Sequence, residues 1–260
     1  MVEGAYTLRN FYLYLFVFFS SILHAVDQPP SYFTNSDIER IFHTYVKPYQ
    51  TDEFAHRYEV LPLEKNHLPW RWEGKDFARI IPLLEFEQFV REYKLISSRA
   101  LSLNSCNDPE WNLIPTQSID HINYIDDIES YDLHNLNLSI YDYDFVMINN
   151  TLEHVYDPIL CLKNIYKHLK SQGIIYLQVP VNSMPHDTPH HYYTGFTPTG
   201  LCVLLMSAGF RILHVGSWGN YEYLEKMYKT RNWPDYRELS KPGLNDFNHP
   251  ISTWAFAIKD

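Results

Sequence analysis

The chain has 260 residues, of which 45% are hydrophobic and 20% charged; this excludes an intrinsically disordered protein and favours a domain with a packed core. The formal net charge of −10 at pH 7 excludes a protein that binds nucleic acid through a basic surface. The cysteines Cys106, Cys161 and Cys202 form no CxxC pair, which excludes a zinc knuckle.

Residues 11–23 form an apolar run, FYLYLFVFFSSIL, which follows Arg9. The run is short for a membrane span but has the length of a signal-peptide core. We therefore expect residues 1–25 to be a signal peptide or a membrane anchor, which would place the protein at a membrane or in the secretory pathway. The alternative is a buried first helix, and the protein would then be cytoplasmic.

Two helical patterns occupy residues 26–97, which we expect to form a helical cap. Apolar residues spaced by three and four predict a helix within 36–60. Residues 76–94 predict another helix, broken or started afresh near Pro82, because proline lacks the amide hydrogen that a helix interior needs.

From residue 98 the chain alternates between short apolar runs and longer helical patterns. Short apolar runs are typical of strands that are covered on both faces. The predicted strands are 100–103, 119–124, 145–148, 174–179, 211–215 and 253–259.

The segments 157–169 and 197–208 predict helices, since each starts with a capping residue and a proline. The order of elements predicts an α/β domain over residues 98–260, with a mainly parallel sheet. Ligands of such sheets bind at the carboxyl ends of strands. This rule directs attention to residues 104–108, 125–127, 149–154 and 180–194.

An ordered series of short motifs runs through the second half of the chain. It includes the sequences YDFV at 143–146, LEHV at 152–155, VP at 179–180 and AGF at 208–210. In this order they resemble class I S-adenosylmethionine-dependent methyltransferases of the type 11 and type 23 kind. The resemblance implies a Rossmann-like sheet of seven strands, shortened here, with an antiparallel last strand, and S-adenosylmethionine as the cofactor.

The loop after the first predicted strand departs from that family, whose loop is rich in glycine. Asn104, Ser105, Cys106 and Asn107 occupy it here. Asparagine tolerates the left-handed backbone better than other residues with a side chain, so the turn can persist without glycine. The resemblance therefore assigns these four residues to cofactor binding through an altered loop.

The resemblance implies further cofactor contacts at later strand ends. An acid that holds the ribose hydroxyls follows the second strand, where Asp126 and Asp127 are the candidates, and Asp132 matches the acid near the adenine. Asn149 and Asn150 follow the strand at 145–148 and complete the expected contacts. The alternative for the acids is a solvated acidic loop.

Methyl transfer to an oxygen or nitrogen acceptor requires positioning and a base. Histidine suits the base because its pKa lies near neutrality. His154 and His191 follow two neighbouring predicted strands, and we expect them to be catalytic. The alternative for His154 is a structural role that braces its loop.

A metal site is also suggested by three closely spaced histidines, His186, His190 and His191. Pro185 and Pro189 exclude the helix on which closely spaced ligands usually lie. We therefore predict no metal ligand in this chain.

The expected function is methyl transfer from S-adenosylmethionine to a small-molecule or glycan-type acceptor. The aromatic-rich segment 217–236 would line the acceptor pocket, unless it is only a packed surface loop. The alternative function is that of a catalytically inactive, methyltransferase-like binding or scaffold module. No nucleic-acid partner is expected, and residues 11–23 would provide any association with a membrane.

Overall fold

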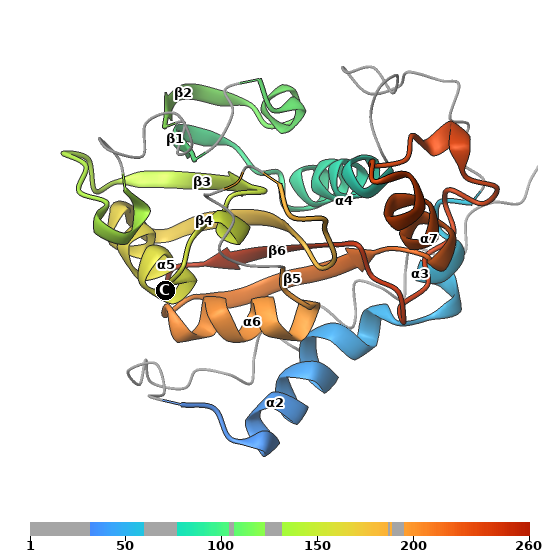
Figure 1. The fold of residues 1–260 in the computed structure, drawn as a ribbon. Helices are drawn as coiled ribbons and strands as arrows, with labels where there is room; N and C mark the ends of the chain where they lie inside the picture. The colour runs from blue at the N-terminus through green and yellow to red at the C-terminus, as the bar shows by residue number, and fades with distance from the viewer. Residues whose placement is uncertain (1–31, 60–76, 104–106, 123–131, 187, 189–194) are drawn as a thin grey trace, which may run out of the picture.

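The computed structural model describes residues 32–59, 77–103, 107–122, 132–186, 188 and 195–260 (Figure 1). The predicted N-terminal segment 1–25 lies outside these residues. Among the residues that are described, no helix is both long and apolar enough to cross a membrane.

A six-stranded sheet with the order β2-β1-β3-β4-β6-β5 forms the centre of the described structure. The first four strands pair in parallel, whereas β6 runs antiparallel between β4 and β5. The predicted α/β sheet with an antiparallel last strand is thus confirmed. The strands are β1 (Ser97–Ser102), β2 (Thr116–His121), β3 (Tyr143–Asn149), β4 (Leu169–Pro180), β5 (Arg211–Trp218) and β6 (Ser252–Ile258).

The sheet has six strands in the described residues, whereas the resemblance implied seven. Between β2 and β3, the described residues 132–142 form the 3-10 turn η4 (Leu133–Asn135) and no strand. This agrees with the shortened sheet that the sequence predicted.

Helices cover both faces of the sheet. Helix α4 (Phe77–Tyr93) packs on one face, and α5 (Pro158–His168) and α6 (Pro198–Ser207) pack on the other (Figure 1). The other helices of the described residues are α2 (Asn35–Ile41), the π-helix η1 (Phe42–Val46), α3 (Asp52–His56) and α7 (Tyr221–Thr230). The further 3-10 turns are η2 (Lys47–Tyr49), η3 (Pro109–Asn112), η5 (Leu152–His154) and η6 (Tyr236–Glu238).

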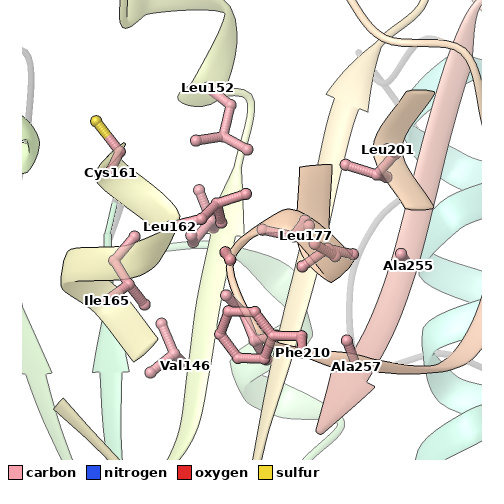
Figure 2. Close-up of a cluster of buried hydrophobic side chains, with 14 of the residues drawn as sticks. Val146, Leu152, Cys161, Leu162, Ile165, Leu177, Leu201, Phe210, Ala255 and Ala257 are labelled. Atoms are coloured by element: carbon pink, nitrogen blue, oxygen red, sulfur yellow. The ribbon is translucent and has the colours of Figure 1, made fainter. Parts of the chain in front are cut away.

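Side chains on the two faces of β3 belong to two separate hydrophobic clusters, because successive side chains of a strand point in opposite directions. Phe145 and Met147 join the cluster under α4, whereas Val146 and Ile148 join the cluster under α5 and α6. Figure 2 shows the second cluster, in which strand residues meet the two helices. Its labelled members are Val146, Leu152, Cys161, Leu162, Ile165, Leu177, Leu201, Phe210, Ala255 and Ala257.

The described helices of residues 26–97 pack on the sheet and its helices. Helix α4 buries Ile80, Leu83 and Phe86 in the cluster that it shares with the strands. On the opposite side, α2 and η1 pack against α6, and η1 also contacts β5. The part of the predicted cap that the structure describes therefore belongs to the layers around the sheet.

Helix α4 continues through Pro82, so the predicted break at this residue is wrong. Proline removes the amide hydrogen that would bond to the carbonyl of Ala78. Gln178 in β4 donates its side-chain Nε2 to that carbonyl oxygen at 3.4 Å. A hydrogen bond from the sheet thus replaces the one that proline removes from the helix.

We expect Phe86→Ala to lower the free energy of unfolding by about 3–5 kcal/mol, because the phenyl ring is fully buried between Tyr176 and Phe256. Tyr228→Ala is the matched control, since that ring is 57% exposed in α7, and its effect should stay within about 0.5 kcal/mol. Urea denaturation measures both values. Equal losses in the two variants would contradict this placement of the core.

Candidate functional site

The carboxyl ends of β1 and β3 are tied together by side chains. Asn149, the last residue of β3, donates its Nδ2 to Oδ2 of Asp108 at 3.0 Å. Thr151 donates its hydroxyl to the carbonyl of Leu103 at 2.9 Å, and both partners are buried. These bonds fix the start of the loop after β3 beside the loop after β1.

Asn150 bends the chain away from the end of β3. Its φ of 46° lies in the left-handed region, which asparagine tolerates better than most residues. Its backbone N–H donates to the carbonyl of Gln178 at 2.8 Å, and its exposed side chain lies at the rim of a cavity. The loop after β3 is therefore held against β4 at the edge where ligands of such sheets bind.

The fully buried Glu110 and the largely buried Arg79 form an ion pair under this edge. The guanidinium binds the carboxylate through two nitrogens, with Nη2 to Oε2 at 2.6 Å, and it also donates to Oε1 of Gln178. Burial opposes the positive charge of Arg79, but the adjacent Glu110 carboxylate outweighs that effect and raises the pKa of the guanidinium. One charged side chain thus joins α4, η3 and β4.

A cavity of about 180 Å³ opens at the ends of β3 and β4. The aromatic-rich segment 217–236 contributes Tyr223 and Trp233 to its wall, and Arg79 reaches it from α4. Its volume lies below the range of roughly 300–1,000 Å³ that is usual for ligand pockets. Its lining residues are Ala78, Arg79, Asn150, Glu153, Gln178, Pro180, Asn182, Ser183, His186, Tyr223, Trp233, Ile251 and Ser252.

Glu153, His154 and His186 gather at one side of this cavity. Glu153 and His154 are each 1% exposed, and Oε1 of Glu153 lies 3.9 Å from Nε2 of His154. The rings of His154 and His186 stand perpendicular, with their centroids 5.0 Å apart. One ligand atom from each of the three residues lies within 4.8 Å of the other two, so the group is able to hold a metal ion.

The structure brings some of the predicted site residues to this edge. Asn149, Asn150 and His154 lie there, and Asn107 is exposed in the turn before Asp108. The remaining predicted residues, Asn104, Ser105, Cys106, Asp126, Asp127 and His191, lie outside the described residues.

Asp132 caps the turn η4. Its Oδ1 accepts a bond from the backbone N–H of His134 at 3.0 Å and lies 2.7 Å from Nδ1 of the same residue. The His134 ring stacks on Tyr156 and accepts a bond from the backbone N–H of Asp157, where α5 begins. In the described structure Asp132 thus fixes the connection to α5, and its assignment to the adenine stays a prediction.

Sequence reasoning did not select Arg79, Glu110 or Gln178. A signal for Arg79 exists, since it is a lone charge in the apolar sequence FARIIPLL at the start of α4. Glu110 and Gln178 carry no comparable signal, because their partner lies far away along the chain. Glu153 belongs to the LEHV motif, yet the motif directed attention only to its histidine.

Comparison with known families finds one described as "Methyltransferase domain", whose model matches residues 85–215, about half of the chain. The match begins inside α4 and ends inside β5. The comparison with curated protein sequences finds no match.

Solved structures of similar proteins include methyltransferases at low identity. An S-adenosylmethionine-dependent methyltransferase from Mesorhizobium loti is 12% identical, with 72% of this chain and 100% of that chain covered and a TM-score of 0.45. The N-methyltransferase NodS from Bradyrhizobium japonicum, solved with S-adenosyl-L-homocysteine, is 12% identical, with coverage of 79% and 96% and a TM-score of 0.44. A methyltransferase from Archaeoglobus fulgidus is 17% identical, with coverage of 70% and 95% and a TM-score of 0.41.

We expect Glu110→Gln to lower the free energy of unfolding by about 3–5 kcal/mol, because it leaves the buried guanidinium of Arg79 without its main counter-charge. The matched control is Glu87→Gln, whose partner Arg91 is 75% exposed, and it should cost about 0–1 kcal/mol. Urea denaturation distinguishes the two. A loss below about 1 kcal/mol for Glu110→Gln would rule out the buried pair as the anchor of this edge.

Proposed function

The chain belongs to the methyltransferase domain family, and from that premise we propose that it transfers a methyl group from S-adenosylmethionine to a small-molecule or glycan-type acceptor. The observation that supports this most directly is the matched domain itself, which spans the sheet edge where the cavity opens. The bound cofactor supplies an electrophilic methyl group on a positively charged sulfur.

The charged end of the cofactor fits the residues at this edge. This end of S-adenosylmethionine carries two cations, a sulfonium and an ammonium group, and one carboxylate. Among the described residues, this edge holds the carboxylates of Asp108, Glu110 and Glu153 and the guanidinium of Arg79, and carboxylates attract a bound cation. Asp108 and Asn149 would hold this end of the cofactor, because the hydrogen bond between them joins the carboxyl ends of β1 and β3.

The adenosine end is assigned from the sequence alone. We propose that Asn104, Ser105, Cys106 and Asn107 contact the cofactor as an altered loop, and that the acids that follow β2 bind its ribose. These acids are Asp126 and Asp127. We assign Asp132 to the adenine, and Asn150, at the rim of the cavity, to a further contact with the cofactor.

The residues around the cavity would position the acceptor and take up its proton. Methyl transfer to an oxygen or nitrogen would require the acceptor to lose a proton, which a residue of the chain would take up. His154 and His191 are the proposed bases, since a positioned imidazole accepts a proton near neutral pH. The small volume of the cavity favours a small acceptor or the end of a glycan, with Tyr223 and Trp233 as its aromatic wall.

The alternative function, an inactive binding module, is supported by the connection between β1 and β2. Its described residues, 107–115, form the 3-10 turn η3 in place of an α-helix. A helix there would aim its N-terminal amides at a bound ligand. The described part of this connection therefore offers fewer backbone donors to a cofactor than a helix would.

For the N-terminal segment we propose a targeting role, on the strength of the apolar run 11–23. Deletion of residues 1–25 should move the protein from the membrane fraction of lysed cells to the supernatant without changing its unfolding transition. A buried first helix predicts the opposite pair of results, namely an unchanged distribution and a loss of stability.

Calorimetric titration of the full-length chain with S-adenosylhomocysteine tests the cofactor. We expect a micromolar Kd, and a Kd raised about 10–100-fold in Asp108→Asn, because a charged hydrogen bond contributes about 1.5–3 kcal/mol. Glu87→Gln, on the outer side of α4, should bind like the wild type. Absence of binding at millimolar ligand would favour the inactive module.

The proposed bases are tested by formation of S-adenosylhomocysteine with a panel of hydroxyl, amine and glycan acceptors. His154→Asn and His191→Asn should each lower turnover by about 10²–10⁴-fold while the Kd for S-adenosylhomocysteine stays within twofold. His56→Asn is the control, because His56 is 58% exposed in α3 and pairs with Glu59. Wild-type turnover in both site variants would refute the base assignment.

A further inference from the structure

We propose that Glu153, His154 and His186 form a binding site for one divalent transition-metal ion, of the Zn²⁺ class, in the wall of the cavity. The binding of the ion does not depend on methyl transfer. Only the use of the ion, described below, rests on the proposed function.

The types of side chain support this site. One carboxylate with two imidazoles is a donor set that first-row divalent metals accept, and three protein ligands leave a coordination position open. Glu153 is 1% exposed, so its carboxylate has largely left water. A divalent ion bound here would place a positive charge directly against this buried carboxylate.

The spacing of the three residues also suits an ion. Donor atoms lie about 2.0–2.2 Å from a bound Zn²⁺, so that they are about 3–4 Å from one another. Oε1 of Glu153 and Nε2 of His154 are already 3.9 Å apart, and all three ligand atoms fall within 4.8 Å. Movements of about 1 Å or less would complete the coordination.

A hydrogen bond sets the tautomer of His186. Its Nδ1 lies 2.8 Å from the carbonyl oxygen of Met184. A carbonyl only accepts hydrogen bonds, so Nδ1 carries the proton and the lone pair is on Nε2. A ring that donates one nitrogen to a carbonyl and offers the other is the arrangement typical of metal-binding histidines.

The local backbone holds the other two ligands in place. Glu153 and His154 lie in η5, directly after β3, and the backbone N–H of His154 donates to the carbonyl of Thr151 at 3.0 Å. Thr151 is itself bonded to Leu103 at the end of β1. These ligands are therefore attached to the sheet rather than to a long surface loop.

The open side of the site faces the cavity, because Glu153 and His186 both line it. If the proposed function holds, an acceptor hydroxyl would bind the ion there, and coordination would lower the pKa of that hydroxyl. The hydroxyl proton would pass to solvent, the methyl group would move from sulfur to oxygen, and the neutral thioether would remain. The acceptor class is then a small molecule with a hydroxyl group. With the ion bound, His154 would act as a metal ligand, and His191 alone would remain as the proposed base.

The test is calorimetric titration of the metal-free full-length chain with Zn²⁺. We expect one ion per chain with a Kd below 1 μM, and a Kd raised at least tenfold in Glu153→Gln and in His186→Asn. The double variant His56→Asn with Glu59→Gln removes a histidine–glutamate pair at the surface, and it should bind like the wild type. Visible absorption of bound Co²⁺, lost in His186→Asn, gives a second readout.

Two results would overturn the site: no stoichiometric binding to the wild type, or binding that neither site variant weakens. If Glu153→Gln does not fold, His186→Asn decides, because His186 is only half-buried in its loop. Titration of the same preparation with S-adenosylhomocysteine separates the two proposals. Zinc binding without cofactor binding supports the metal site and counts against methyl transfer. Cofactor binding without zinc binding supports methyl transfer and overturns the metal site.

Discussion

The buried ion pair of Arg79 and Glu110 is the constraint on which the arrangement of the site depends. Glu110 is fully buried and the Arg79 side chain is only 14% exposed, so removing either partner leaves a largely desolvated charge without its direct contact. The pair therefore fixes α4 to the connection between β1 and β2, and the bond from Arg79 to Gln178 extends this link to β4. The cavity and the hydrogen-bonded carboxyl ends of β1 and β3 both lie beside this ion pair.

The chemistry of this edge favours cations. Among the described residues, the carboxylates of Asp108 and Glu110 lie against the guanidinium of Arg79, and that of Glu153 lies beside the imidazoles of His154 and His186. A sulfonium group and a divalent metal ion both benefit from such surroundings. The two proposed ligands would share this edge, with Asp108 and Asn149 proposed for the cofactor and Glu153, His154 and His186 for the metal ion.

The sequence predicted some of this site and missed the rest for identifiable reasons. The LEHV motif follows a strand directly, so that His154 could be placed at the carboxyl edge from local pattern alone. Arg79 could not be placed at this edge from the sequence, because its helix precedes β1 and its partners come from two later parts of the chain. The break predicted at Pro82 failed for a similar reason, since the compensating donor is Gln178 in another element.

By itself the sequence determined the alternation of strands and helices, the capped starts of α5 and α6, and the polar residues at the strand ends. These features depend on residues that are near neighbours in the chain, such as Asp157 and Thr197 with the amides that they cap. Only the tertiary structure decided that α4 lies on a sheet face, and that Glu153 and His154 meet His186. Those contacts join residues from separate elements, and burial and charge compensation select them only when the layers pack together.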